Sequence, residues 1–228
     1  MVDKVPIYII LNATDFISFF ILKMNNYQAI IFDLGNVIFK FSFENTFNYW
    51  AKILNLEPNE VSQRFEFNGA FKQFEKNEIT PNQFMKHVSN KLGFELTEKQ
   101  FEKGWNSIYE EMVPGILNTL RALRINYKLV ALTNTNVIHS KVWKIKYAEA
   151  LNFFEKIFCS HEIKVRKPEH KAYEIVLKYL NIGPKRIVYL DDNYDCVKSA
   201  SEMGIKSLTV SSHDKMIHDL KKIGIKIE

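Results

Sequence analysis

The stretch QAIIFDLGNV, residues 28–37, has an apolar run that stops abruptly at the carboxylate of Asp33. The run has the length and composition of a buried parallel strand, and Gly35 and Asn36 follow it as loop formers. Asp33 is therefore predicted at the C-terminal end of a central strand, where ligands of open α/β sheets bind. The alternative is that Asp33 only caps a turn, which is a common use of aspartate.

Two later apolar runs also end in polar residues. Residues 128–132 (KLVAL) stop at Thr133-Asn134, and residues 186–190 (RIVYL) stop at Asp191-Asp192. Further strands are expected at residues 156–158 and 205–210, and helices at 116–124, about 169–180 and 196–203. This alternation predicts right-handed βαβ units, and hence an α/β fold with a parallel, Rossmann-like sheet in a three-layer αβα core.

A different pattern fills residues 44–112, where apolar residues recur at helical spacing. TPNQ at 80–83 and TEKQ at 97–100 read as capping boxes that begin helices through Leu92 and Tyr109. About four helices and no strand are expected here. Just before them, Phe39, Phe41 and Phe43 alternate with Lys40 and Ser42, which suggests a short hairpin or flap beside Asp33.

These patterns divide the chain of 228 residues into one core with an insertion. Residues 24–40 and 113–228 are predicted to form the core, and residues 41–112 a helical cap. Residues 1–23 are an N-terminal extension of unclear role. Its apolar part is interrupted by Asn12 and Asp15 and is shorter than the ~20 residues that cross a bilayer, so no membrane role is expected.

Charge and cysteine content bear on the partners and the cellular compartment of the protein. The chain carries a net charge of +5, but its basic residues are scattered, whereas a nucleic-acid binder concentrates them on one face, so no nucleic-acid partner is expected. The two cysteines, Cys159 and Cys196, belong to no metal-ligand spacing. They are typical of a reduced compartment, which favours the cytoplasm. No oligomeric state is predicted.

In a parallel sheet, the ends of the three strands named above lie at one edge. Asp33, Thr133-Asn134 and Asp191-Asp192 should meet there, and Lys167, from the loop before a helix, can reach the same edge. Three carboxylates would repel one another unless a cation joins them, and hard divalent cations prefer oxygen ligands, so a magnesium site is expected. Taken singly, Thr133 and Asn134 could be turn residues, Lys167 a surface charge and the aspartate pair a helix N-cap.

The order FDLGNV, LTN, RKP and LDDN, from residue 32 to residue 193, resembles the four motifs of the haloacid dehalogenase superfamily of phosphohydrolases. Asn68-Gly69-Ala70-Phe71, Gly104-Trp105 and the TNTN string at 133–136 look like the small bacterial sugar-phosphate phosphatases of that superfamily, typified by α-D-glucose-1-phosphate phosphatase. The resemblance extends from Gln28 to about Val210.

The resemblance implies a role for each motif residue. Asp33 would be the nucleophile that attacks phosphorus. Magnesium would be held by Asp33, the Gly35 carbonyl and Asp192, with Asp191 holding metal-bound water. The Thr133 hydroxyl and the Asn134 backbone amide would bind phosphate oxygens. Lys167 would offset the negative charge of nucleophile and phosphate.

One position departs from the superfamily's usual pattern. Most of its phosphatases carry a general acid and base two residues after the nucleophile, and this chain has Gly35 there, as the resembling subgroup does. General acid–base help is worth ~10²–10⁴-fold, so a slow reaction, a good leaving group or another proton donor is expected. His139 is one candidate donor, although such a histidine more often packs a helix start.

We expect the cap to determine which substrate binds. Phe71, Lys72, Arg64 and Trp105 are candidates for facing the site, although core packing explains Phe71 and Trp105 at least as well.

The sequence therefore predicts a magnesium-dependent phosphatase acting on a small phosphorylated metabolite such as a sugar phosphate. A carbon–halogen hydrolase of the same fold needs no leaving-group acid, which would account for Gly35 but not for Asp191-Asp192. A phosphate-binding relative without turnover is the second alternative.

Overall fold

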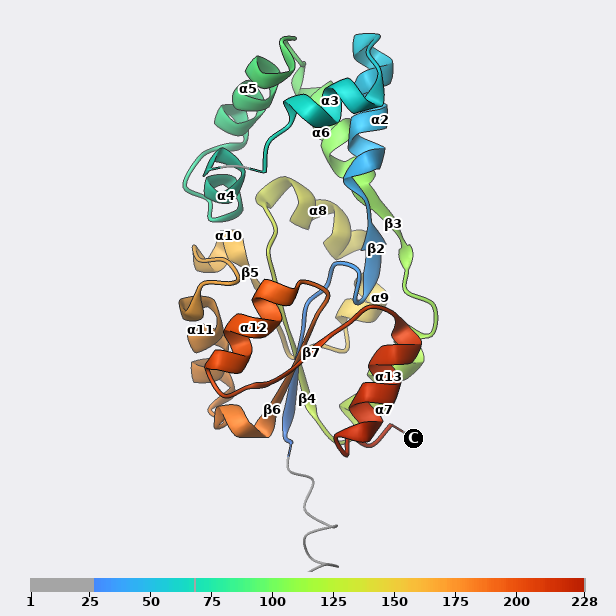
Figure 1. The fold of residues 1–228 in the computed structure, drawn as a ribbon, viewed down its shortest axis with the longest axis vertical. Helices are drawn as coiled ribbons and strands as arrows, with labels where there is room; N and C mark the ends of the chain where they lie inside the picture. The colour runs from blue at the N-terminus through green and yellow to red at the C-terminus, as the bar shows by residue number, and fades with distance from the viewer. Residues whose placement is uncertain (1–26, 68, 228) are drawn as a thin grey trace, which may run out of the picture.

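A five-stranded parallel sheet forms the centre of the computed structural model, which describes residues 27–67 and 69–227. The strand order is β5-β4-β1-β6-β7, so β1 lies in the middle (Figure 1). The strands are β1 (Ala29–Phe32), β4 (Lys128–Thr133), β5 (Lys156–Cys159), β6 (Ile187–Asp191) and β7 (Lys206–Thr209). All four neighbouring pairs are parallel, as the alternation of apolar runs and helices predicts.

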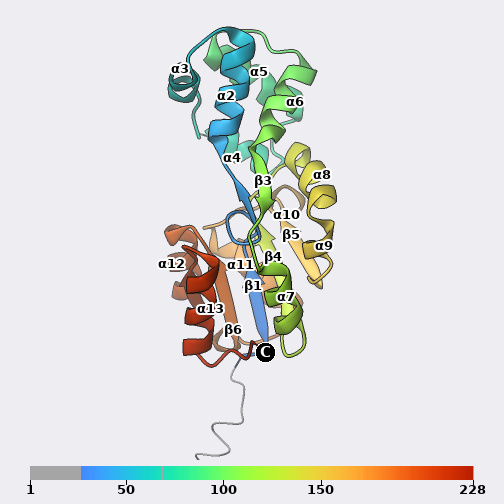
Figure 2. The same cartoon turned by 90° about the vertical axis from the view of Figure 1, so that its right-hand side faces the viewer.

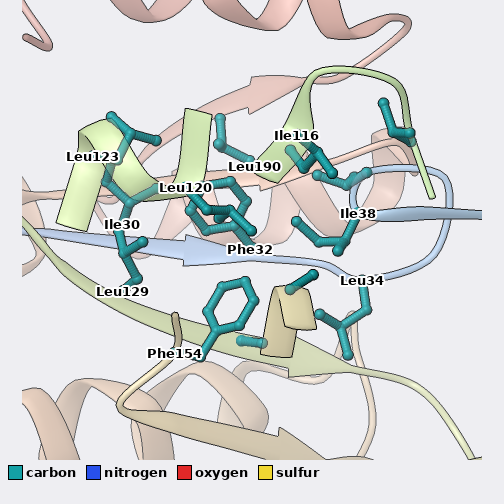
Figure 3. Packing of buried hydrophobic residues seen from close by; sticks show 14 of the residues in the cluster. Ile30, Phe32, Leu34, Ile38, Ile116, Leu120, Leu123, Leu129, Phe154 and Leu190 are labelled. Atoms are coloured by element: carbon teal, nitrogen blue, oxygen red, sulfur yellow. The ribbon is translucent and has the colours of Figure 1, made fainter. Parts of the chain in front are cut away.

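Every residue of β1 is buried, and successive side chains of a strand point to opposite faces of the sheet, so both faces must be covered. Helices cover both of them. Ile30 and Phe32 pack toward α7 (Ile116–Arg124) and α13 (His213–Lys222), and Figure 3 shows Leu120 and Leu123 of α7 against them. Ala29 and Ile31 pack on the other face. The helices that cover that face are α11 (His170–Leu180) and α12 (Tyr194–Glu202). The predicted three-layer αβα core is confirmed.

The register of the sheet brings the polar strand ends together. Phe32 lies beside Ala131 of β4 on one side and Leu190 of β6 on the other. The backbone amide of Asp33 continues this pairing by donating to the Leu190 carbonyl at 2.7 Å. Asp33 is therefore placed at the carboxyl edge of the sheet, between the ends of its two neighbouring strands.

Five helices of the described chain lie together beyond this edge, at the upper end of the molecule in Figures 1 and 2. They are α2 (Phe43–Leu54), α3 (Pro58–Arg64), α4 (Gly69–Glu75), α5 (Pro81–Leu92) and α6 (Glu98–Trp105). Thr80 and Thr97 form the capping boxes that begin α5 and α6, as predicted. The apolar faces of the five helices form a separate, largely aromatic cluster, which also includes Ile138 from α8 (Val137–Lys146). The division into core and cap at residues 40 and 113 stays a proposal.

Two short strands join these helices to the sheet domain. The period-two pattern correctly indicated a strand at Phe39–Phe41, but the expectations of a local hairpin and of no strand within residues 44–112 are wrong. β2 (Phe39–Phe41) pairs antiparallel with β3 (Tyr109–Met112), so it forms no local hairpin, and the helix expected to reach Tyr109 ends at Trp105. The partners are far apart in the chain, and local periodicity carries no signal for such pairing. The insertion also contains one helix more than the four expected, because α3 buries only Val61 and so shows no apolar period.

The described residues contain no helix long and apolar enough to cross a membrane. The predicted N-terminal extension, residues 1–23, lies outside the described part of the chain.

Candidate active site

Lys167 forms the centre of the candidate site. Its Nζ lies 2.7 Å from Asp33 Oδ1 and 2.6 Å from Asp191 Oδ2. The Lys167 side chain is only 3% exposed, so the alternative of a surface charge is wrong. A buried lysine held by two buried carboxylates is a costly arrangement that structure alone seldom requires, and it is typical of functional sites.

The pKa values follow from this packing. Burial raises the pKa of Asp33 to about 7, Asp191 and Asp192 add to the rise, and Lys167 opposes it. Burial would lower the pKa of Lys167, but Asp191 and Asp33 outweigh that effect and raise it above the ordinary value for lysine. Lys167 therefore stays positively charged and compensates part of the negative charge at the strand ends.

The two aspartates that end β6 are held by different partners. Asp191 accepts hydrogen bonds from the Tyr189 hydroxyl and, at 2.8 Å, from the backbone amide of Asn193. Asp192 accepts from Asn36 Nδ2 at 2.9 Å, in the loop that follows β1. The N-cap of α12 is Asn193, so the alternative that the aspartate pair serves as the N-cap is wrong.

The three carboxylates lie close enough together to hold a divalent cation. One oxygen each from Asp33, Asp191 and Asp192 lies within 4.8 Å of the others. The donor set consists of oxygen atoms, which suits magnesium, and one lysine is too little charge to balance three carboxylates. Gly35 lies in the loop that follows β1, next to Asn36.

Asn134 has a second role that the sequence did not indicate. Its Nδ2 donates to the Lys167 carbonyl at 2.9 Å, and its Oδ1 accepts from the Lys167 backbone amide at 2.8 Å. The side chain therefore fixes the lysine loop against the end of β4. Thr133 is buried, and both residues line a cavity of about 80 Å³.

Gly35 borders the same cavity, and its lack of a side chain has a visible cause. A Cβ atom built on Gly35 would lie 2.5 Å from Cε1 of Phe41, which also lines the cavity. Phe41 thus occupies the space of a side chain at position 35. An aspartate at position 35 would require the Phe41 ring to shift or a smaller residue to replace it.

The cap residues expected to face the site behave differently from one another. Phe71 lines the cavity, as predicted. Trp105 is fully buried among the aromatic residues of the cap, so its packing interpretation is confirmed. Arg64 donates to the Leu92 carbonyl within the cap, and Lys72 is exposed. Neither basic residue lines the cavity, and the expectation that they face it is wrong.

His139 is not a proton donor at neutral pH. It stacks on Trp105, its Nε2 lies 2.9 Å from the Trp105 carbonyl, and its Nδ1 lies 3.1 Å from Asn136 Nδ2. The carbonyl requires a proton on Nε2, so Nδ1 accepts from the amide. Burial lowers the pKa of His139 to about 3, although the hydrogen bond to the backbone opposes this shift. Packing at a helix start, the alternative that the sequence offered, is confirmed.

A neutral, buried His139 predicts a specific dependence of stability on pH. Between pH 6.5 and 3 the unfolded chain binds one proton more than the folded chain at this site, so the free energy of unfolding falls on acidification. Urea titrations measure this effect. Between pH 7.5 and pH 5, the free energy of unfolding of His139→Gln should fall by about 2 kcal/mol less than that of wild type. The exposed His218→Gln serves as the control. If the free energy of unfolding fell equally in all three proteins, His139 would be protonated to the same extent in the folded and unfolded chains at pH 5, which would contradict the assignment.

Two residues of the site were missed by sequence reasoning. Tyr189 lies two positions before Asp191 on the same strand, so period-two alternation could have placed both on one face. Glu75, at the end of α4, lines the cavity from the cap and pairs with Arg166. No pattern in the sequence distinguishes Glu75 from the other acidic residues of the cap helices.

The fold, the three polar strand ends and the loop that carries Lys167 point to one class of hydrolase. The family model described as haloacid dehalogenase-like hydrolase matches residues 27–204, and the chain belongs to this family.

Individual relatives agree with this assignment. D-ribitol-5-phosphate phosphatase of Bacteroides thetaiotaomicron is 21% identical over 185 residues, which are 79% of this chain and 90% of that protein. The crystal structure of a haloacid dehalogenase-family enzyme from Bacteroides thetaiotaomicron matches at 30% identity and a TM-score of 0.73, covering 85% of this chain and 98% of that one. A wild-type structure of that enzyme in complex with magnesium and inorganic phosphate matches at 31% identity and a TM-score of 0.71, covering 82% and 96%.

Proposed function

We propose that this protein is a magnesium-dependent phosphatase that hydrolyses a small phosphorylated metabolite, with sugar and polyol phosphates as the substrate class. The observation that carries the proposal is the buried pairing of Lys167 with Asp33 and Asp191 beside Asp192. The phosphatase relatives and the magnesium and phosphate bound to a similar enzyme support it. The free, buried cysteines are consistent with the expected cytoplasmic location.

Asp33 is the proposed nucleophile. One of its carboxylate oxygens bonds to phosphorus while the bond from phosphorus to the leaving oxygen breaks, and that oxygen takes a proton. Water then attacks the phosphorus, which releases inorganic phosphate and regenerates the Asp33 carboxylate. No side chain at position 35 can supply or accept these protons, so substrates with good leaving groups should react fastest.

The neighbouring residues position and stabilise the reacting groups. Lys167 compensates the charge of Asp33 and of the phosphate, and Asn134 holds Lys167 in place. We assign the Thr133 hydroxyl and the Asn134 backbone amide to the phosphate oxygens. Asp33, the Gly35 carbonyl and Asp192 would hold magnesium, and Asp191 would orient its water. When bound, magnesium supplies charge that stabilises the transferring phosphoryl group.

The proposal is tested by measuring phosphate release from a panel containing D-ribitol 5-phosphate, other sugar phosphates, nucleotides and p-nitrophenyl phosphate. We expect release in the presence of Mg²⁺, loss with EDTA, and recovery when Mg²⁺ is returned in excess. Halide release from a 2-haloacid without metal would favour the carbon–halogen hydrolase. If the folded protein binds inorganic phosphate but releases none from any ester, the non-catalytic alternative is correct.

A further inference from the structure

A carboxylate from the cap reaches the cavity beside the proposed phosphate site. Glu75 is the last residue of α4, and it is 6% exposed. It shares the cavity with Gly35, Thr133 and Asn134 from the carboxyl edge of the sheet. Among the described residues that line this cavity, only Glu75 carries a carboxylate. It belongs to a different element from the three aspartates and has no part in the proposed transfer step.

Glu75 is held in place from the core. Arg166 Nε lies 2.7 Å from Glu75 Oε2, and Arg166 is the residue before Lys167. Burial raises the pKa of Glu75, while Arg166 and, more weakly, Lys167 oppose the rise. The loop that carries the lysine therefore also fixes the direction of the cap carboxylate. A group fixed in this way loses little conformational entropy when a ligand binds to it.

The rest of the cavity wall is mostly aromatic, with rings from Phe39, Phe41, Phe43, Phe71, Tyr109 and Trp143. A phosphate bound at Thr133 and Asn134 would leave the carbon chain of the ligand between these rings and Glu75. Ring faces suit C–H groups, but they offer a hydroxyl no strong acceptor. A carboxylate oxygen is such an acceptor. A hydroxyl can donate to it, whereas an alkyl chain or a second anionic group cannot.

We propose that Glu75 accepts a hydrogen bond from a hydroxyl of the substrate's carbon chain and thereby selects polyol and sugar phosphates over alkyl phosphates. This specificity role rests on the proposed phosphatase function. Its physical basis is that Arg166 donates to Glu75 Oε2, and that burying the other carboxylate oxygen against a chain without a donor carries a desolvation cost, which the wrong substrate cannot repay. Glu75 is a binding residue in this account, and Arg166 is the residue that positions it.

A purely structural tie between cap and core is the competing role for the Glu75–Arg166 pair. α4 contacts the core helix α10 (Ser160–Ile163), so loss of the pair could loosen the cap as a whole. A looser cap would slow every substrate to a similar degree. A lost hydrogen bond would slow only substrates that carry the hydroxyl. The ratio of two substrates therefore separates the two roles.

The experiment compares D-ribitol 5-phosphate with n-pentyl phosphate, which has the same number of carbons and no hydroxyl. Steady-state kcat/KM is measured with Mg²⁺ for wild type, Glu75→Gln and the control Glu78→Gln. Glu78 is an acidic residue near α4 that pairs with Lys76. Wild type should prefer the ribitol ester. Glu75→Gln should lower kcat/KM for that ester by about 10-fold, with a much smaller change for the pentyl ester, because a neutral amide oxygen replaces a charged acceptor and binds the hydroxyl more weakly. Glu78→Gln should match wild type with both.

An equal loss with both esters in Glu75→Gln, or no preference for the ribitol ester in wild type, would overturn the specificity role while phosphatase activity stands. Absence of phosphate release from both esters and from p-nitrophenyl phosphate in wild type would overturn both proposals. If circular dichroism shows that Glu75→Gln is unfolded, Glu75→Asp is measured instead. This variant keeps the charge but withdraws the oxygens by one methylene, and an unchanged substrate ratio there would also overturn the role.

Discussion

Asp33→Asn is expected to abolish magnesium-dependent phosphate release, with a loss of at least about 10³-fold in kcat. An amide oxygen is a poor nucleophile toward phosphorus, whereas it can still accept the hydrogen bond from Lys167 that Asp33 Oδ1 now accepts at 2.7 Å. The variant should therefore fold normally. Phosphate release from p-nitrophenyl phosphate and urea unfolding should be measured together.

The matched control is Asp214→Asn, which makes the same chemical change at a fully exposed carboxylate on α13. Its activity should equal that of wild type. Residual activity above about a tenth in a folded Asp33→Asn protein would contradict the nucleophile assignment.

Lys167→Met is expected to lower the free energy of unfolding by about 3–5 kcal/mol at neutral pH in the absence of metal. The methionine side chain fills a similar volume, so the effect comes from the charge. Without the ammonium group, Asp33 and Asp191 face each other as buried acids whose main partner has gone. Activity should disappear as well, since no group then offsets the charge of nucleophile and phosphate.

Urea titrations monitored by circular dichroism measure this loss. Lys171→Met, the same change at an exposed position on α11, should leave the free energy of unfolding within about 0.5 kcal/mol of wild type. A loss below about 1 kcal/mol in Lys167→Met would show that the two carboxylates do not depend on the lysine, and the proposed charge balance of the site would then be wrong.

The strand ends of the core were predictable from the sequence. A buried parallel strand is a nearly continuous apolar run, so the points at which such runs stop at Asp33, Thr133 and Asp191 are visible without a structure. Parallel topology then brings those points to one edge. Lys167 entered the prediction through its place in the loop before a helix, the RKP motif then gave it a role, and the structure supplied its contacts with Asp33 and Asp191.

Contacts between distant parts of the chain were not predictable in this way. The pairing of β2 with β3 and the ion pair of Glu75 with Arg166 join segments that local periodicity treats separately. The neutral state of His139 depends on burial beneath Trp105, which the sequence does not show. Cap residues could be ranked only by type, so Arg64 and Lys72 were favoured for their charge, and Glu75 was overlooked.

The proposed covalent role of Asp33 can be tested directly by acid quenching during turnover, followed by mass spectrometry of the peptide that contains Asp33. p-Nitrophenyl phosphate is the suitable substrate, because its leaving group needs no acid and the phosphorylated enzyme should form quickly. Gly35 offers no base to speed attack by water, so the phosphorylated enzyme should accumulate. We predict an added mass of about 80 Da on Asp33 in the presence of Mg²⁺, absent in Asp33→Asn. Phosphate release without this adduct in wild type, or with the adduct on another residue, would contradict the account.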